Sequence, residues 1–328
     1  MNKKHKNSLN FSRSFMPLNH KKNANRNIST KEIINLYETH RPFLRQPLRE
    51  GKAHKVNSIM DIADEFDAFI LDSFGVLNVG GEIINGVFEA IQELEKKNKI
   101  LIILTNGASY PTFKKVNLFQ SWGLPLNEAN VISSRDLLKL YLSKNQEKIW
   151  GVIGSPNSDL SELGVNGYIL GPKMDFSKEC EGFIYLGCEF WNDNNQKILE
   201  SFLKNKKTTI LVGNPDIIAP QNKGFSLEPG FWSLKFKKFK NIKIEYFGKP
   251  HLDIYKMAIN QIFKIANRRI DLNRIVMIGD SLHTDILGGL SSQISTVLVT
   301  EHGLFKDYDY MNAIKKTKIS PDWIIPSL

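Results

Sequence analysis

Five polar side chains that lie far apart along the chain have the types that transfer of a phosphoryl group requires. They are Asp72, Thr105, Lys249, Asp280 and Asp285. A carboxylate can attack phosphorus, a hydroxyl can hold phosphoryl oxygens, and an ammonium group can offset the charge on the transferring group. Paired carboxylates also suit magnesium, which takes oxygen ligands and binds substrate phosphate. Together these residues predict a site for phosphoryl transfer.

Each residue also has an ordinary structural interpretation. Asp72 could cap a turn, and Thr105-Asn106-Gly107 could form a strand-to-helix turn. Lys249 could be an exposed loop lysine, and Asp280 could cap a helix. The order of the five residues favours the chemical interpretation, because a nucleophile, a hydroxyl, a cation and two acids follow successive elements.

Three of the polar groups stand directly after apolar runs of strand length. The runs are Ala68–Leu71 before Asp72, Ile100–Leu104 before Thr105, and Ile275–Ile278 before Gly279 and Asp280. Buried parallel strands are continuously apolar, and their carboxyl ends meet at one edge of the sheet. Helices alternate with these runs, and a fourth strand is expected at the end. These elements are Gly86–Lys97, Pro111–Trp122, Leu252–Ile265, Thr284–Leu290 and strand Thr296–Val299. The pattern predicts an α/β fold with a Rossmann-like parallel sheet.

A second alternating stretch interrupts this pattern. Its expected strands are Ile149–Ile153, Gly182–Leu186 and Thr209–Val212, and its expected helix is Asn194–Asn205. We therefore predict a core formed by residues 58–144 and 239–328, with an inserted α/β cap domain at 145–238. The stretch Trp232–Lys240 alternates apolar residues with lysines, which predicts an amphipathic helix near the boundary.

The positive charge of the chain belongs to its N-terminal arm. Residues 1–57 hold thirteen Lys and Arg against three Asp and Glu, and residues 58–328 hold equal numbers of each sign. A neutral body argues against a nucleic-acid partner, because such proteins usually have a basic face, although the basic arm itself could contact anionic partners. The first residues predict a partly disordered leader, with an organelle transit peptide as the alternative to a cytoplasmic protein. Ser29 followed by Glu32 predicts a capped helix within the arm.

Composition also excludes some classes of protein. The longest apolar runs have only the length of a strand, which excludes a membrane-spanning helix. The two cysteines, Cys180 and Cys188, match no metal or redox spacing, so we expect reduced structural thiols.

Taken together, the motifs resemble the haloacid dehalogenase-like (HAD) superfamily of hydrolases, and more narrowly its class IIA, the NagD-like and pyridoxal-phosphatase-like members. The segments that carry the resemblance are Asp72-Ser-Phe-Gly-Val-Leu, Leu104-Thr-Asn, Asn214-Pro-Asp, Gly248-Lys-Pro-His, Gly279-Asp280 with Thr284-Asp-Ile, and Ser320-Pro-Asp-Trp. They cover about residues 66–328.

The resemblance implies a role for each residue of the site. Asp72 would be the nucleophile, Lys249 would assist it, and Thr105, Asn106 and Lys249 would hold the phosphoryl group. Mg²⁺ would bind Asp72, Asp280 and the backbone carbonyl of Phe74, with Asp285 orienting its ligands. Residues 145–238 would be a type-two cap that selects a small phosphorylated metabolite, with Asn214 and Asp216 near the substrate. Caps of this type often dimerise in the family, so a homodimer is also implied.

One position departs from the family pattern. Most members have a second aspartate two residues after the nucleophile, where it acts as general acid and base, but this chain has Phe74. An aromatic residue here resembles an uncharacterised subgroup of class IIA.

Three consequences of Phe74 stay open. The protein could be a slow phosphohydrolase restricted to good leaving groups. Another residue could replace the acid, with His251 or a cap residue as candidates. The protein could also bind a phosphorylated ligand without turnover. In the cap, Phe190 and Trp191 are further candidates to lie near the substrate.

Overall fold

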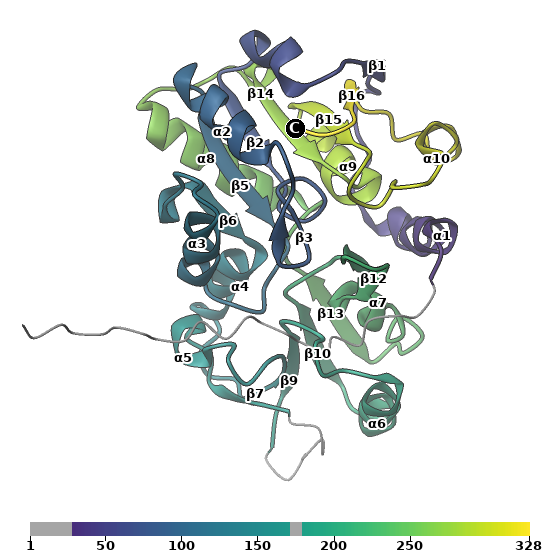
Figure 1. The fold of residues 1–328 in the computed structure, drawn as a ribbon. Helices are drawn as coiled ribbons and strands as arrows, with labels where there is room; N and C mark the ends of the chain where they lie inside the picture. Colours follow the sequence, from purple (N-terminus) through teal and green to yellow (C-terminus); the bar gives the residue numbers. More distant parts are fainter. Residues whose placement is uncertain (1–27, 171–178) are drawn as a thin grey trace, which may run out of the picture.

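The computed structural model describes residues 28–170 and 179–328 of the chain, and two parallel sheets dominate it (Figure 1). The larger sheet has the strand order β1-β16-β15-β14-β2-β5-β6, and all its neighbouring strands are parallel. Its strands are β1 (His54–Lys55), β2 (Ala68–Leu71), β5 (Ile100–Thr105), β6 (Val131–Ser133), β14 (Ile275–Gly279), β15 (Ser295–Val299) and β16 (Trp323–Ile325). The predicted Rossmann-like parallel sheet is therefore confirmed.

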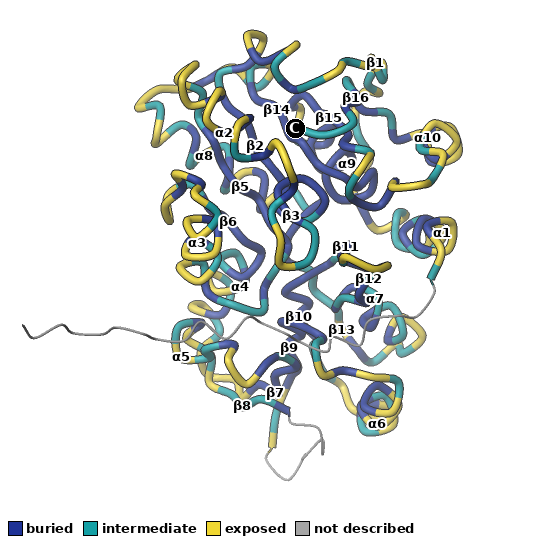
Figure 2. Tube along the Cα trace, viewed as in Figure 1, coloured by how far each residue is buried: buried dark blue, intermediate teal, exposed yellow. Residues whose placement is uncertain are grey.

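Alternate residues of the central strands face opposite layers of helices. One layer holds α8 (Leu252–Ala266), whose Ile254 and Ala258 pack with Ile70 and Met277 of β2 and β14. The other layer holds α2 (Val87–Lys96), α3 (Thr112–Ser121) and the 3₁₀ helix η2 (Ile59–Glu65). Because both faces are covered, the middle strands are fully buried, as Figure 2 shows, and their carboxyl ends are held rigidly.

The smaller sheet forms the lower half of the molecule in Figure 1 and has the order β13-β10-β9-β7-β8. Its strands are β7 (Trp150–Ile153), β8 (Gly167–Ile169), β9 (Gly182–Tyr185), β10 (Thr208–Val212) and β13 (Ile242–Tyr246). Helices α5 (Leu160–Leu163), α6 (Asp193–Leu203) and α7 (Pro229–Leu234) accompany it. We call this part, through Tyr246, the cap.

The edge strand β13 corrects the expected boundary at residue 238. It pairs in parallel with β10 from Thr208↔Ile242 to Val212↔Tyr246, so the second sheet extends to Tyr246. Its sequence Ile-Lys-Ile-Glu-Tyr alternates apolar and polar residues, as an edge strand exposed on one side does. The prediction had assigned this stretch to the core, which was expected to resume at residue 239.

The expected helix over Trp232–Lys240 is also wrong in its bounds. Helix α7 begins at Pro229, a favoured first helical residue, and ends at Leu234. After α7 the chain continues in short hydrogen-bonded turns. In one of them the Phe236 N–H donates to the carbonyl of Ser233. Similarly, the expected helix at 284–290 consists of a π-helical turn, η5 (Leu282–Ile286), followed by α9 (Leu287–Ser291).

The remaining elements are short or lie at the edges. Two short hairpins are β3 (Asn78–Val79) with β4 (Glu82–Ile83) and β11 (Ile218–Pro220) with β12 (Phe225–Leu227). Helix α4 (Ser134–Leu142) follows β6, and α10 (Tyr310–Thr317) precedes β16. Single 3₁₀ turns occur at η1 (Arg41–Phe43), η3 (Glu128–Asn130) and η4 (Leu272–Arg274).

The N-terminal helix α1 (Thr30–His40) contacts both halves of the molecule. Its predicted capping box is confirmed, since Ser29 Oγ accepts from the Glu32 N–H at 3.3 Å and Glu32 Oε2 accepts from the Ser29 N–H at 2.8 Å. On the core side, Tyr37 stacks on His283 of η5, with ring centroids 5.0 Å apart. On the cap side, the Tyr37 hydroxyl accepts from the Ile217 N–H at 3.1 Å. The helix therefore joins the core to the cap (Figure 1).

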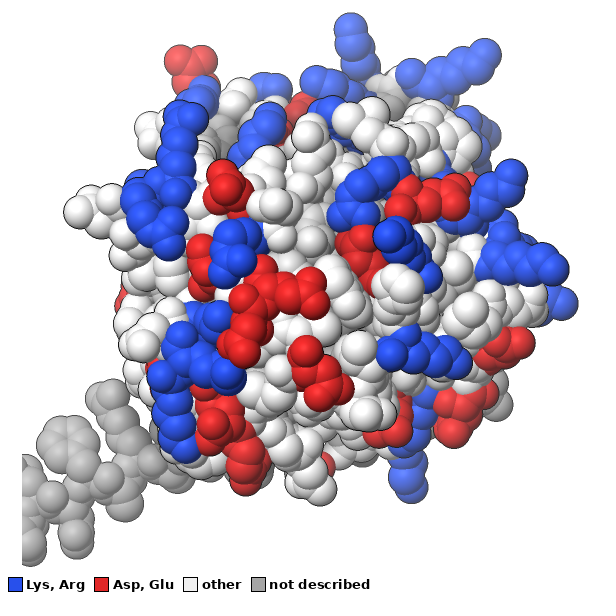
Figure 3. All heavy atoms as spheres, turned by 90° about the horizontal axis from the view of Figure 1, so that it is seen from above, with Lys and Arg blue, Asp and Glu red and all other residues white. Residues whose placement is uncertain are grey.

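The surface and the two cysteines match the compositional analysis. Figure 3 shows Lys and Arg interspersed with Asp and Glu over the face in view, without a continuous basic area on that face. In the described ranges, no helix combines the length and the apolar character needed to cross a bilayer. Both cysteines are free thiols, and Cys188 is buried.

Candidate active site

The predicted nucleophile stands at the carboxyl end of β2, in the middle of the larger sheet. Asp72 continues the register of the strand, because its N–H donates to the carbonyl of Ile278 in β14 at 2.9 Å. The chain then turns sharply at Gly75, which has φ of +80°. A Cβ atom at Gly75 would lie 2.5 Å from Asp280 Oδ2, so glycine is required for the two carboxylate loops to approach.

Lys249 reaches this carboxylate from the loop between β13 and α8. Its ammonium Nζ donates to Asp72 Oδ1 at 2.5 Å and to Asp285 Oδ1 at 2.7 Å, and the side chain is almost fully buried. The preceding Gly248 has φ of +123°, and a Cβ there would lie 2.4 Å from Asn106 Oδ1. The predicted convergence of Lys249 and Asp72 is confirmed.

The last two acids follow β14. Asp280 Oδ1 accepts from the Ser281 hydroxyl, and its Oδ2 accepts from the backbone N–H of Leu304 at 2.9 Å. Asp285 lies on the π-helical turn, where its Oδ2 accepts from the Ser281 N–H at 3.1 Å. One oxygen from each of Asp72, Asp280 and Asp285 lies within 4.8 Å of the others, so these three carboxyl groups form a candidate cation site.

The electrostatics of the cluster fit a divalent cation. Burial raises the pKa of Asp72 to about 7, with the charge of Asp285 adding to the rise and Lys249 opposing it. Burial and the charges of Asp285 and Asp72 raise the pKa of Asp280 to about 8. Burial alone would lower the pKa of Lys249, but Asp285 and Asp72 outweigh it and raise that pKa. One ammonium group cannot neutralise three carboxylates, and a hard cation with oxygen ligands would offset the remainder.

These pKa directions predict how the protein without metal responds to pH. The folded pKa values of about 7 and 8 lie above the value of roughly 4 for an unfolded aspartate, so the folded state binds more protons in between. The protonation of Asp72 and Asp280 therefore stabilises the folded state fully below about pH 4. This stabilisation is lost as the pH rises through their folded pKa values of about 7 and 8. We expect Mg²⁺ to raise the melting temperature more at about pH 8 than at about pH 5.

Thermal melts in chelator and in Mg²⁺ at both pH values measure this difference. The Asp280→Asn variant is the matched control, because it keeps the shape of the side chain and removes one charged ligand. A cation effect that is larger at the lower pH, or is unchanged in Asp280→Asn, would contradict the site.

Thr105 and Asn106 also lie in the site. The side chain of Asn106 hydrogen-bonds other residues of the site. Thr105 ends β5 and its hydroxyl accepts from the Gly107 N–H at 3.2 Å. The Asn106 Oδ1 accepts from the Lys249 N–H at 2.7 Å, and its Nδ2 donates to the Lys249 carbonyl at 3.1 Å and to Asp216 Oδ1 at 2.8 Å. The side chain of Asn106 therefore holds the backbone of Lys249 and a carboxyl group of the cap.

The candidate cap residues divide into two groups. Asp216 reaches the core through its bond to Asn106, whereas Asn214 shapes the turn, its Oδ1 accepting from the Asp216 N–H at 2.9 Å. Trp191 is buried inside the cap and donates its indole N–H to Gln196 at 2.9 Å. Phe190 is half exposed and lines a small cavity of about 140 Å³ in the cap.

The structure gives no support to His251 as the replacement acid. Its ring stacks on Tyr246 of the cap, with centroids 6.0 Å apart. Burial lowers its pKa below the ordinary value, so the ring is neutral near pH 7 and has no proton of suitable acidity to donate. Phe74 itself lies in the turn after Asp72 and is partly buried.

Sequence reasoning missed two contributors to the site. Tyr37 reaches the loop that contains Asp216 from a helix far away in sequence, and Leu304 supplies a backbone N–H to Asp280. A glycine signals the second contact, since a Cβ at Gly303 would overlap the carboxylate of Asp280. The sequence carries no comparable signal for Tyr37.

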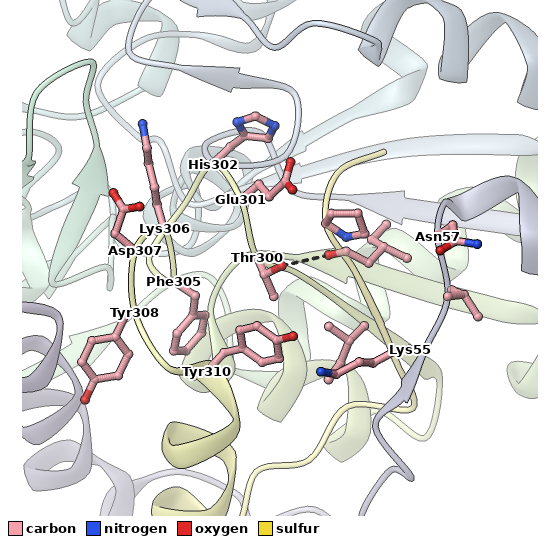
Figure 4. Close-up of a pocket in the computed structure, with 14 residues that line it drawn as sticks. Lys55, Asn57, Thr300, Glu301, His302, Phe305, Lys306, Asp307, Tyr308 and Tyr310 are labelled. Carbon is pink, nitrogen blue, oxygen red and sulfur yellow. Dashed lines mark hydrogen bonds between the residues drawn. The ribbon is translucent and has the colours of Figure 1, made fainter.

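A second cavity, larger than the one in the cap, lies away from these residues. It has a volume of about 850 Å³ and lies between β1, β16 and the segment from Thr300 to Tyr310 (Figure 4). Its lining includes Lys55, His302 and Tyr310, and none of the five predicted site residues belongs to it. Size alone therefore does not identify the chemical site.

Comparisons with known proteins agree with this geometry. The family model described as haloacid dehalogenase-like hydrolase matches residues 69–168, and the one described as HAD-hydrolase-like matches residues 246–328. Ribonucleotide monophosphatase NagD of Escherichia coli K12 is 25% identical over 260 residues, which cover 79% of this chain and 95% of NagD. Dihydroxyacetone phosphatase of Corynebacterium glutamicum is 24% identical over 262 residues, or 80% of this chain and 89% of that protein.

Solved structures show the same fold. A possible sugar phosphatase of the HAD superfamily from Cytophaga hutchinsonii superposes with a TM-score of 0.74 at 24% identity, over 84% of this chain and 98% of its own. NagD from E. coli gives a TM-score of 0.60 at 23% identity, over 80% of this chain and 96% of that one. The matched segments contain the loop of Asp72, the loop of Lys249 and both acids after β14, so this chain belongs to the haloacid dehalogenase-like hydrolases, in the NagD-like class IIA.

Proposed function

We propose that this protein is a magnesium-dependent phosphatase that hydrolyses a small phosphorylated metabolite through an aspartyl phosphate on Asp72. The observation that carries the proposal is the buried contact of Lys249 with Asp72 beside two further carboxylates. A protein that only binds phosphate has no need for a carboxylate at the centre of the site. The phosphatase names of NagD and of dihydroxyacetone phosphatase support the same class of substrate.

The residues divide the reaction between them. Asp72 attacks phosphorus and forms the acyl phosphate, while Lys249 balances charge on the nucleophile and on the transferring group. The Thr105 hydroxyl and nearby backbone N–H groups hold the phosphoryl oxygens. Asp72, Asp280 and the carbonyl of Phe74 would hold Mg²⁺, and Asp285 would orient its ligands. The cation would neutralise negative charge on the phosphoryl group.

Phe74 removes the usual acid–base group from this reaction. A phenyl ring can neither protonate the leaving oxygen nor activate water, and a positioned acid–base group is worth about 10²–10⁴ in rate. Leaving groups that depart as stable anions depend least on such a group. If no other residue supplies that proton, we expect turnover to be fastest with aryl and acyl phosphates and slow with alkyl phosphates.

The second candidate function is binding of a phosphorylated ligand without turnover, and Phe74 is the observation that favours it. The two functions differ in a direct assay of purified protein. Release of phosphate from an aryl phosphate that requires Mg²⁺ and is lost in Asp72→Asn would support the phosphatase. Absence of release, together with a rise in melting temperature on adding phosphate esters, would instead establish the binding protein.

A panel of phosphorylated metabolites, assayed with Mg²⁺ and with chelator, then narrows the substrate. The Asp72→Asn variant serves as the blank for every compound. Because the carboxylate cluster is deeply buried, selection must come from the cap, and substrates should be small enough to fit beneath it.

A further inference from the structure

A carboxyl group of the cap, that of Asp216, reaches the core beside Lys249. This residue follows β10 and is partly exposed, whereas its neighbours Pro215 and Ile217 are buried. Its Oδ1 accepts from Asn106 Nδ2 at 2.8 Å, and the same amide group hydrogen-bonds the backbone N–H and carbonyl of Lys249. The ammonium group of Lys249 in turn touches Asp72. Asp216 is thus connected to the nucleophile through two residues.

The direction of attack places the leaving group toward the cap. Phosphoryl transfer proceeds with the attacking and leaving oxygens roughly in line. Asp72 attacks from the end of β2, in the floor formed by the core sheet. The leaving oxygen therefore points away from that floor, to the side from which Asp216 reaches Asn106.

The hydrogen bonds assign different roles to the two oxygens of Asp216. Asn106 Oδ1 must face the Lys249 N–H, since only the oxygen of the amide can accept, and this fixes Nδ2 toward Asp216. Asp216 Oδ1 is consequently an acceptor. Within the described part of the chain, Oδ2 has no hydrogen-bond partner, so a proton on Oδ2 is available to a ligand.

The surroundings favour the protonated form. Burial raises the pKa of Asp216 well above its ordinary value, and the charges of Asp72 and Asp285 act in the same direction, while Lys249 and the bond from Asn106 oppose them. Tyr37 faces the same loop and is itself uncharged, because burial raises its pKa. A carboxylic acid held neutral in this way resembles the general acids of other hydrolytic enzymes.

We propose that Asp216 is the general acid and base that takes over the proton transfers that Phe74 cannot perform. As Asp72 bonds to phosphorus, the bond from phosphorus to the leaving oxygen breaks, and that oxygen takes the proton from Asp216 Oδ2. The products are an alcohol, the acyl phosphate and a charged Asp216. Asp216 then removes a proton from the water that attacks the acyl phosphate, which frees inorganic phosphate and restores both residues. This role rests on the proposed function, and it assigns the acid–base group that Phe74 cannot provide.

The loop holds Asp216 tightly enough for this role. The Asp216 N–H donates to Asn214 Oδ1 and its carbonyl accepts from the Gly230 N–H, both at 2.9 Å. The next N–H, of Ile217, donates to the Tyr37 hydroxyl of α1 at 3.1 Å. Tyr37 is therefore a positioning residue that couples the N-terminal helix to the acid.

Steady-state kinetics of Asp216→Asn on two substrates test the proposal. The value of kcat/KM reports the steps up to departure of the leaving group. With 4-nitrophenyl phosphate, whose phenolate departs without a proton, we expect kcat/KM to change by less than about threefold, with a burst of phenolate because water attack is slowed. With glycerol phosphate, whose alkoxide needs a proton, we expect kcat/KM to fall by about 10²–10⁴.

Two controls separate this role from a structural one. Asp253→Asn makes the same change at an exposed carboxylate of α8 and should match the wild type on both substrates. Tyr37→Phe removes only the hydroxyl that accepts from Ile217, and it should lower activity on glycerol phosphate more than on the aryl ester. Melting temperatures identify any variant that has lost its fold.

The outcomes are distinct. Equal losses on both substrates would overturn the proposal, since Asp216 would then only support Asn106 and Lys249. No loss on glycerol phosphate would overturn it as well. If the wild-type protein releases no phosphate from the aryl ester, the proposed function itself fails, and that result is separate from either of these.

Discussion

Replacing Asp72 with asparagine is expected to lower phosphate release from an aryl phosphate by on the order of 10⁴-fold or more, the scale seen when a catalytic nucleophile is removed. An amide has no charge with which to attack phosphorus, so no acyl phosphate forms. The substitution keeps the size of the side chain, and the amide oxygen can still accept from Lys249, which now contacts Asp72 at 2.5 Å. The fold should therefore survive.

Stability of this variant provides an independent measurement. Asp72 is one of three clustered, buried carboxylates, of which Lys249 contacts two, and removing its charge relieves repulsion. We expect the melting temperature in chelator to be unchanged or higher at about pH 8, where the carboxylates are otherwise charged. Acid-quenched wild-type protein should show a phosphoryl adduct on the peptide that contains Asp72. An active Asp72→Asn protein, or an adduct elsewhere, would place the nucleophile on another residue.

The chemical residues were predictable because each follows a local pattern. An apolar run that ends in a polar group identifies a buried parallel strand and its carboxyl end, and β2, β5 and β14 have this form. Since parallel strands deliver these ends to one edge, three separate motifs were enough to place Asp72, Thr105 and Asp280 together. Lys249 follows a strand of the other sheet, so only its place in the order of the five residues favoured it.

The remaining features depend on contacts that no local pattern encodes. The edge strand β1 lies far from its neighbour β16 in the sequence, and the two pair over only two positions. The side chain of Asn106 looked suited to phosphate, but its use was decided by the backbone of Lys249, which arrives from far along the chain. In the same way, α1 was predictable as a capped helix, while the partners of Tyr37 were not.

The position of Phe74 gives the prediction with the largest expected gain in activity. If Asp216 supplies the proton, adding a second acid at Phe74 should increase turnover of alkyl phosphates only modestly in the wild-type protein. In the Asp216→Asn protein, however, Phe74→Asp should raise kcat/KM for glycerol phosphate by about 10²–10⁴, because the new carboxyl group replaces the lost acid. The gain should be small for 4-nitrophenyl phosphate, whose leaving group needs no proton.

The matched control for this rescue is Phe74→Ala in the same Asp216→Asn background. Phe74 is partly buried in the nucleophile loop, so any smaller residue also opens space beside Asp72. Rescue by aspartate and not by alanine would show that the acid, and not the space, restores turnover. Equal rescue by both residues would mean that access to the site limits the reaction. A large gain from Phe74→Asp in the wild-type protein would mean that Asp216 does not already supply the proton, because a site with a working acid has little to gain from a second one.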